Sequence, residues 1–297
     1  MRHIKKLLFI YNPRSGKGQI KNKLLDILDV FAKQGYKIEV HPTQQSGDAT
    51  TAVLERANDF DRIICSGGDG TLDEVVLGMM QSKIKLPIGY IPAGSTNDFA
   101  RSLKIPSNMV KAASIAISDH IFKTDIGALN GEYFVYVAAF GIFTEVTYAT
   151  PQNMKNTLGH SAYVLEAIKS LPSIKSYQMR VTWEEGTIEG DFIYGMVTNS
   201  VSVGGFKGIT GQHVFLDDGY AEVTLVRASL SPIELNEAMI ALIDRNYESP
   251  NLISFKSSHV TFQSLEPVPW TRDGEYGGTH SIADINIHPQ AIELFVP

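Results

Sequence analysis

The sequence predicts an N-terminal α/β domain built on a doubly wound parallel sheet, followed by a mainly antiparallel β domain. Three observations support this prediction. The chain has 297 residues, more than the roughly 100 to 200 residues of an ordinary single domain. Up to about residue 125, short apolar runs alternate with segments of helical period, as in a βαβ series. Beyond that point, strand-like runs follow one another at short spacing.

In the first part of the chain, each expected strand is a short run of β-branched or apolar residues that precedes a helical segment. The strand and helix pairs are, in chain order, Lys6–Tyr11 with Ile20–Gln34, Lys37–Val40 with Asp48–Ala57, Arg62–Cys65 with Leu72–Met80, and Pro87–Ile91 with Asn97–Leu103. Strands that alternate with helices in this way favour a parallel sheet.

The second part contains strand patterns and two helical stretches. The expected strands are Tyr133–Ala139, Tyr177–Trp183, Ile188–Thr198, Ala221–Val226 and His259–Ser264. The helices are Gly159–Leu171 and Ser231–Arg245, the second with Ser231 as N-cap and Pro232 at its first helical position.

Composition and charge exclude several classes of protein. Hydrophobic residues make up 43% and charged residues 20% of the chain, which is typical of a globular protein and excludes disorder and collagen-like repeats. A net charge of -6 gives no support for nucleic-acid binding. The lone Cys65 cannot form an internal disulfide, so we expect a cytoplasmic protein. The longest nearly apolar stretch, Tyr133–Phe143, is too short to span a bilayer.

Two glycine loops follow predicted strands and lead into helices. Residues 12–18 read Asn-Pro-Arg-Ser-Gly-Lys-Gly; they match neither a Walker A loop nor Gly-x-Gly-x-x-Gly, and either a phosphate site or an ordinary turn would suit them. Residues 66–71 read Ser-Gly-Gly-Asp-Gly-Thr, where glycines allow close approach to a ligand and Thr71 is placed to cap the next helix. Asp69 there would serve Mg²⁺ or a hydroxyl group, or only a local hydrogen bond. Cys65 is expected to be a core residue.

A third polar loop, residues 92–101, follows the fourth strand and reads Pro-Ala-Gly-Ser-Thr-Asn-Asp-Phe-Ala-Arg. The carboxyl ends of strands in an open parallel sheet line the ligand crevice. We therefore expect the three loops to converge on one nucleotide-sized site.

Two acidic turns mark the second part. Residues 215–220, Phe-Leu-Asp-Asp-Gly-Tyr, suit either a β-turn or a divalent-cation site, and Arg272–Glu275, Arg-Asp-Gly-Glu, could be only a hairpin. The histidines show no His-x-x-x-His spacing and no Gly-x-Ser-x-Gly elbow occurs, so zinc chemistry and a serine hydrolase lack support.

Five segments, 12–16, 67–71, 94–101, 216–219 and 273–275, occur together in an order that resembles a known family. The chain is similar over nearly its whole length to the bacterial diacylglycerol kinase family of soluble lipid kinases. Sphingosine kinases share this pattern, whereas NAD kinases and phosphofructokinases share only the Gly-Gly-Asp-Gly core. The resemblance implies an ATP-binding domain over residues 1–125, to which 285–297 returns, and a β-sandwich lipid-substrate domain over 126–284, with the active site in the cleft between them.

The resemblance also implies which residues bind the nucleotide and the metal. The residues implied to hold ATP are Asn12, Pro13, Arg14, Ser15, Gly16, Thr43, Gly67, Gly68, Asp69, Gly70, Thr71, Leu72, Asp73 and Ser95. The family usually has Thr where Ser95 stands and often has Asn where Asp73 stands. A structural Mg²⁺ would be bound by the Asp218 carboxylate and the carbonyl groups of Phe215 and Tyr220.

For catalysis, the resemblance implies that Glu275 is the base, while Asp69 serves the nucleotide and its Mg²⁺. Asp273 could hold the catalytic Mg²⁺ or act on Glu275 through like-charge proximity. The expected reaction transfers the γ-phosphoryl group of ATP to a lipid hydroxyl, most simply that of diacylglycerol, to yield phosphatidic acid.

Other functions stay open at this point. They are a kinase for another lipid alcohol, such as a sphingoid base, monoacylglycerol or phosphatidylglycerol, a kinase similar to NAD kinase, and a nucleotide-binding regulatory protein without turnover. A lipid substrate would require peripheral membrane contact, for which Lys155 and Lys207 could supply positive charge, although both also suit an ordinary solvated surface. No nucleic-acid partner is expected, and a homodimer stays open.

Overall fold

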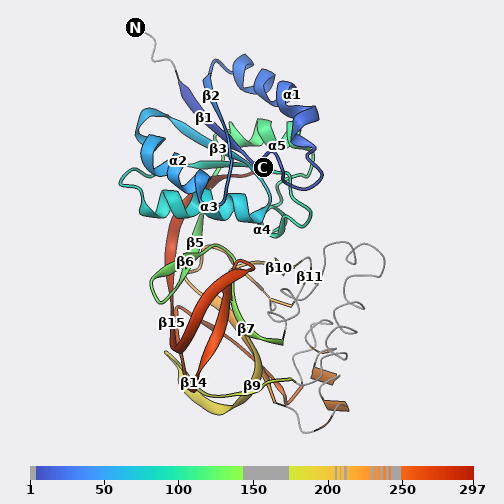
Figure 1. Cartoon of the computed structure of the whole chain (residues 1–297), viewed down its shortest axis with the longest axis vertical. Helices are drawn as coiled ribbons and strands as arrows, with labels where there is room; N and C mark the ends of the chain where they lie inside the picture. Colours follow the sequence, from blue (N-terminus) through green and yellow to red (C-terminus); the bar gives the residue numbers. More distant parts are fainter. Residues whose placement is uncertain are drawn as a thin grey trace. The chain divides into compact units, whose positions relative to one another are not determined.

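The computed structural model describes residues 5–142, 174–204, 206–207, 209–210, 213–228, 231, 233–234, 237–238, 241 and 249–297. The chain forms two compact units (Figure 1). Unit 1 comprises Met1–Asp125 and Gln290–Pro297, and unit 2 comprises Ile126–Pro289. No helix within the described ranges is long and apolar enough to cross a membrane.

Unit 1 alternates strands and helices. Its elements are β1 (Lys6–Tyr11), α1 (Ile20–Lys33), β2 (Lys37–Pro42), α2 (Asp48–Arg56), the short 3-10 turn η1 (Ala57–Asp59), β3 (Arg62–Gly67), α3 (Asp69–Gln81), β4 (Ile88–Pro92), α4 (Asp98–Ser102) and α5 (Met109–Ala116). Strand β1 pairs in parallel with β2 and β3, and β3 pairs in parallel with β4. The last strand of the chain, β15 (Glu275–Phe295), pairs in parallel with β4 through Leu294 and Ile88.

Both faces of these parallel strands are buried. Consecutive residues of β1, Leu7, Leu8 and Phe9, are all fully buried although their side chains point alternately to opposite faces. In Figure 1, α2 and α3 lie on one side of the strands, and α1 and α5 lie on the other. Covering on both sides explains why the strands are nearly continuous apolar runs in the sequence.

The predicted strands and helices of unit 1 are found with small shifts at their ends, but α5 is not predicted. This helix begins after Asn108, whose side chain accepts a hydrogen bond from the Lys111 amide, and it buries Met109 and three alanines. The chain re-enters unit 1 at Gln290, later than the expected Ile285, because β15 stays paired with its neighbour in unit 2 through Asn286.

Unit 2 consists mainly of antiparallel strands. Strand β5 (Ile121–Leu129) leads into it, followed by β6 (Glu132–Phe134), β7 (Val137–Gly141), β8 (Tyr177–Trp183), β9 (Gly186–Thr198), β10 (Ser202–Val203), β11 (Phe206–Lys207), β12 (Ala221–Arg227), β13 (Leu252–Ser257), β14 (His259–Arg272) and then β15. Hydrogen-bonded neighbours follow the order β13-β12-β9-β7-β14-β15, with β8 between β9 and β14. The rings of Phe140, Phe262 and Trp270 contact one another in the core.

Two strand predictions in unit 2 need correction. The predicted strand Tyr133–Ala139 is interrupted between β6 and β7, because the backbone amides of residues 135–137 donate to a carboxylate instead of to a neighbouring strand. The predicted strand His259–Ser264 continues to Arg272 as β14.

Two further predictions fall on parts of the chain that are not described, or only in part. Helix Gly159–Leu171 and Lys155 lie outside the described residues. Helix Ser231–Arg245 is described at a few positions only. There, the Ser231 hydroxyl accepts a hydrogen bond from the Glu234 amide at 3.2 Å, as expected of an N-cap residue.

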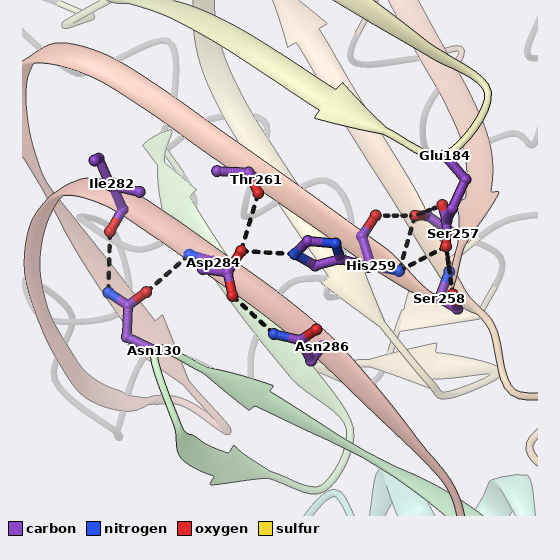
Figure 2. A network of polar contacts seen from close by, with 9 residues as sticks. All are labelled: Asn130, Glu184, Ser257, Ser258, His259, Thr261, Ile282, Asp284 and Asn286. Atoms are coloured by element: carbon purple, nitrogen blue, oxygen red, sulfur yellow. Dashed lines mark hydrogen bonds and ion pairs between the residues drawn. The ribbon is translucent and has the colours of Figure 1, made fainter.

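Glu184 ties together two turns of unit 2. It lies between β8 and β9, and one of its carboxylate oxygens accepts hydrogen bonds from the amides of Ser258 and His259, each at 2.9 Å. The Ser257 hydroxyl donates to the other oxygen at 2.5 Å (Figure 2). This carboxylate therefore holds the β13–β14 turn against the β8–β9 turn.

Next to this contact, Asp284 links β14 and β15. Its carboxylate contacts the His259 ring nitrogen Nε2 at 2.7 Å and accepts hydrogen bonds from Thr261 and Asn286 (Figure 2). The hydroxyl groups of Ser257 and Ser258 donate to Glu184 and not to the His259 ring. These residues therefore lack the hydrogen bond between nucleophile and base that a serine hydrolase has.

We expect Glu184→Gln to lower the melting temperature at pH 7, because an amide has one acceptor oxygen in place of two. Burial raises the pKa of Glu184, but hydrogen bonds from Ser257 and Ser258 outweigh this effect and hold it at about 2, below its ordinary 4.5. A lowered pKa stabilises the fold above about pH 4.5, and this contribution is lost as the pH falls towards about 2. Melting curves at pH 7, 4.5 and 3 should show the difference from wild type shrinking.

Glu185→Gln is the matched control, since it removes the same charge from the next, exposed residue of the turn. A loss of stability in Glu184→Gln that is independent of pH, or one equal to that of the control, would refute the role of this carboxylate.

Candidate active site

The first two glycine loops of unit 1 contact each other directly. The Asn12 amide donates to the Ser66 carbonyl at 2.9 Å, and the Gly68 amide donates to the Ser15 hydroxyl at 3.2 Å. The Asn12 side chain donates to the Thr71 hydroxyl at 3.4 Å. Thr43 follows β2 and lies at the same edge of the sheet, because its amide donates to the carbonyl of Tyr11, at the end of β1, at 2.9 Å.

The third glycine loop packs against the other two. The Ala93 amide donates to the Gly67 carbonyl at 2.7 Å. A Cβ atom added to Gly94 would lie 2.5 Å from the Gly68 Cα, and one added to Gly16 would lie 2.5 Å from the Ala93 oxygen. Only glycine allows such approaches. The three loops therefore converge as the sequence predicts.

Asn97 shapes the third loop. It adopts a left-handed conformation with φ of 52°, and its side chain bonds both the amide and the carbonyl of Gly94, each at 2.9 Å. The buried Tyr90 hydroxyl lies 3.3 Å from the Gly67 carbonyl oxygen and 3.4 Å from Asn97 Oδ1, which links this loop to the second one. Ser95 lies at the exposed tip of the loop.

Helix α3 begins earlier than predicted, so Thr71 is not its N-cap. The helix starts at Asp69 after an extended Gly68, because the Thr71 and Leu72 amides both donate to the Gly68 carbonyl. Leu72 is fully buried and offers no exposed surface to a nucleotide, while Gly70 and Arg14 are exposed. The Cys65 thiol is buried as predicted, which raises its pKa and leaves it inert.

Asp69 binds the start of α4. Its two carboxylate oxygens accept hydrogen bonds from the amides of Asp98, at 3.2 Å, and Phe99, at 3.3 Å. Burial and the charge of Asp98 raise the pKa of Asp69, although the backbone hydrogen bonds lower it. Asp69 thus holds the third loop in place, a contact with residues that follow it by 29 and 30 positions.

Glu74 has a positioning role that the sequence does not reveal. Its carboxylate accepts hydrogen bonds from the amides of Gly47, at 2.8 Å, and Ala49, at 3.1 Å, at the start of α2. A helix that began at Leu72, as the sequence predicts, would place Glu74 in its first turn, where an acidic residue is expected to interact with that helix itself. In the structure Glu74 lies beyond the first turn of α3. Here it joins α3 to α2 and so fixes the second loop against the segment that carries Thr43.

We expect Gly16→Ala to destabilise the protein by about 1 to 3 kcal/mol, because the new methyl group would be forced against the Ala93 carbonyl in a left-handed conformation. Gly16 has φ of 55°. Gly35→Ala is the matched control: its φ is 80°, but a Cβ atom there meets nothing within 4 Å. Equal losses of stability in the two variants, measured by urea denaturation, would contradict the close approach of these loops.

Asp273 uses both carboxylate oxygens on the backbone of unit 2. It accepts hydrogen bonds from the amides of Val135 at 2.7 Å, Tyr136 at 3.0 Å and Val137 at 3.0 Å. The residue itself is left-handed, with φ of 48°. Burial raises the pKa of Asp273 to about 6 against the lowering effect of these hydrogen bonds. These hydrogen bonds support a positioning role, in which Asp273 fixes the backbone of the hairpin.

Glu275 lies on that hairpin with its side chain exposed, at the first position of β15. It pairs across the turn with Arg272, which donates to the Tyr133 carbonyl and lies 3.6 Å from the Glu132 carboxylate. Asp273 therefore fixes the hairpin backbone next to the exposed carboxylate of Glu275.

Two carboxylates and one ammonium group meet where the turn before β12 lies beside β12 and β13. Asp218 accepts a hydrogen bond from the Tyr220 amide at 3.1 Å, and its other oxygen lies 2.8 Å from Lys256 Nζ. The same ammonium lies 3.2 Å from Glu222, whose pKa burial raises to about 7 although Lys256 lowers it. In the described part of the chain, no three His, Cys, Asp or Glu side chains gather as a metal cluster.

Comparison with known proteins identifies the chain. Residues 6–129 match the model of the diacylglycerol kinase catalytic domain. A Staphylococcus epidermidis protein named diacylglycerol kinase is 35% identical over 99% of this chain and 92% of its own length. A Bacillus subtilis protein of the same name is 36% identical over 93% of this chain and 91% of its own length.

A solved structure agrees with these relatives. The crystal structure of a Bacillus anthracis protein described as a candidate diacylglycerol kinase superposes with a TM-score of 0.85 at 25% identity, and the match covers 99% of this chain and 95% of that one. Fold and full-length similarity define a lipid kinase, an enzyme that phosphorylates an alcohol group. The chain belongs to the diacylglycerol kinase family, as its sequence motifs indicate.

Proposed function

We propose that this protein is an ATP- and Mg²⁺-dependent kinase that phosphorylates the hydroxyl group of diacylglycerol and yields phosphatidic acid. The convergence of the three glycine loops is the observation that carries the proposal. It would present backbone amides to the phosphate groups of ATP at the carboxyl ends of parallel strands. Unit 1 would then be a doubly wound nucleotide domain, and unit 2 a β-sandwich lipid domain.

In this proposal, phosphoryl transfer depends on positioning and charge neutralisation more than on covalent chemistry. The exposed Arg14 and Lys17 would add positive charge to the first loop. Asp69 would hold the third loop through the amides of α4. Glu275 would accept the proton of the attacking lipid hydroxyl, and Asp273 would hold the hairpin that carries Glu275.

The family implies bound Mg²⁺, and the residues of unit 2 offer one fitting position. Asp218 already faces an ammonium group at 2.8 Å, and Glu222 is a buried carboxylate beside it, so the donor chemistry suits a cation. The carboxylate of Asp218, with the carbonyl groups of Phe215 and Tyr220, would hold the metal. Mg²⁺ bound there would supply a fixed charge that shapes the turn. Asp273 fits a metal less well, because three amides use its oxygens.

Transfer of labelled γ-phosphate from ATP to a panel of acceptors in detergent micelles tests this function. We expect label in phosphatidic acid when diacylglycerol is present. Preferential label in a sphingoid base, monoacylglycerol or phosphatidylglycerol would show that the acceptor is another lipid alcohol. Label in a water-soluble product with NAD would favour an NAD kinase. Label in no acceptor would favour a regulatory protein.

A lipid acceptor also requires the protein to reach a membrane surface. We expect it to associate peripherally with anionic vesicles at low salt. Its net charge of -6 opposes general attraction to an anionic surface, so binding would depend on local basic or apolar surfaces. The exposed rings of Phe215 and Tyr220 are apolar candidates in unit 2. Vesicle flotation checks this, and absence of association at every salt concentration would count against a bilayer-resident substrate.

A further inference from the structure

One ammonium group is shared by two carboxylates near the start of β12. Lys256 of β13 lies directly opposite Glu222 of β12 in the strand register. Its Nζ atom lies 2.8 Å from Asp218 Oδ2 and 3.2 Å from Glu222 Oε1. The ammonium also lies 5.1 Å from the centre of the Phe215 ring. Lys256 thus contacts side chains of two of the three residues proposed to hold Mg²⁺.

Glu222 is unusual among the carboxylates of unit 2. It is 2% exposed, and the Lys256 ammonium lies 3.2 Å from its carboxylate. Its ion pair with Lys256 is the contact that offsets its burial. A buried carboxylate is costly to keep charged unless a cation lies beside it.

The two carboxylates differ in their access to water. The Asp218 side chain is 28% exposed and the Lys256 side chain 33% exposed, whereas the Glu222 side chain is 3% exposed. A divalent cation arriving from solvent would therefore meet Asp218 first, with the ammonium already beside it. A flexible lysine side chain can move between two carboxylates that both lie within its reach.

We propose that Lys256 is a tethered cation that competes with Mg²⁺ for Asp218, and that Glu222 retains the ammonium when the metal binds. This inference rests on the Mg²⁺ site of the proposed function. Without metal, the ammonium neutralises Asp218. When metal binds, the ammonium group moves fully to the Glu222 carboxylate. The positive charge of Lys256 is then held away from the metal.

Mg²⁺ binding measured by calorimetry on the full-length, nucleotide-free protein tests the competition. The relevant signal is the binding that Asp218→Ala abolishes. Lys256→Met keeps the length of the side chain but removes its charge, and should tighten the Mg²⁺ dissociation constant about tenfold or more. Glu222→Gln removes the alternative partner of the ammonium and should weaken Mg²⁺ binding several-fold relative to wild type.

Lys175→Met is the matched control. Lys175 is also a lysine of unit 2 that pairs with a carboxylate, at 3.4 Å from Glu266, and contacts an aromatic ring, at 4.9 Å from the centre of Tyr177. It should leave Mg²⁺ binding unchanged. Lys256→Met leaves the Glu222 carboxylate buried without its partner, which would destabilise the fold. The double variant Lys256→Met with Glu222→Gln removes that unpaired charge, and it should bind Mg²⁺ more tightly than Glu222→Gln alone.

The outcomes separate this inference from the proposed function. Equal Mg²⁺ affinity in wild type and Lys256→Met, with binding still abolished by Asp218→Ala, would overturn the competition and leave the metal site intact. Binding in Lys256→Met but not in wild type would support the competition in its strongest form. If no variant shows binding that depends on Asp218, both the metal site and the competition fail, while labelled phosphate transfer still reports on the kinase activity.

Discussion

Glu275→Gln should lower kcat by about 10² to 10⁴ while the melting temperature and ATP affinity stay close to those of wild type. The side chain of Glu275 is exposed, and the substitution preserves its volume, so the fold should not depend on it. The proposed role is to accept the proton of the lipid hydroxyl, which glutamine cannot do. Steady-state kinetics, thermal melts and ATP calorimetry measure these three quantities.

Two neighbouring residues serve as controls. Glu132→Gln removes a carboxylate that lies 3.6 Å from the same Arg272, so it tests whether the charge balance of the hairpin matters by itself. Asp273→Asn should instead lower stability by about 1 to 3 kcal/mol, because asparagine tolerates the left-handed backbone but cannot accept all three amide hydrogen bonds. If Glu275→Gln keeps nearly full kcat, Glu275 is not the base.

Asp69→Asn should lower activity about 10²-fold or more and should also cost about 1 to 3 kcal/mol of stability. The second effect follows from its contacts: each carboxylate oxygen accepts an amide of α4, and asparagine would place a donor against one of them. The third glycine loop would lose its anchor, and we expect weaker ATP binding as a result. Urea denaturation, ATP calorimetry and kinase assays measure the three consequences.

Asn108→Ala separates stability from activity in this test. It removes the N-cap of α5, in the same unit, at a cost of about 1 kcal/mol, and it touches none of the glycine loops. Its activity should remain near wild type at a temperature where both variants are folded. Comparable activity losses in the two variants would mean that Asp69 acts through stability alone.

The sequence is most informative where local chemistry decides the structure. The glycine loops at the ends of β1, β3 and β4 could be predicted to converge, because parallel strands bring their carboxyl ends to one edge. Strand Tyr177–Trp183 is found with its predicted bounds, since its alternation of buried and exposed residues is nearly complete. Helix α5 escaped prediction because its 8 residues are too few to show a clear helical period.

Long-range hydrogen bonds could not be predicted in the same way. Asp273 reaches an amide that is 138 positions earlier in the chain, and this contact divides a run of apolar residues that looks like one strand. Glu184 bonds a turn that lies 74 positions later. Lys256 and Glu222 meet only through the pairing of β12 with β13. An acidic residue in a sequence does not reveal whether its partner is a metal, an ammonium group or the backbone.

The most direct test of the proposed reaction is the rate at which labelled γ-phosphate from ATP appears in lipid, measured with diacylglycerol and with its O-methyl ether, in which the free hydroxyl group is blocked. We predict rapid formation of labelled phosphatidic acid from diacylglycerol, none from the ether, and a rate from diacylglycerol that falls about 10²-fold or more in Glu275→Gln. Label that stays in the water phase with both lipids, or equal rates for wild type and Glu275→Gln, would contradict the proposed reaction and its base.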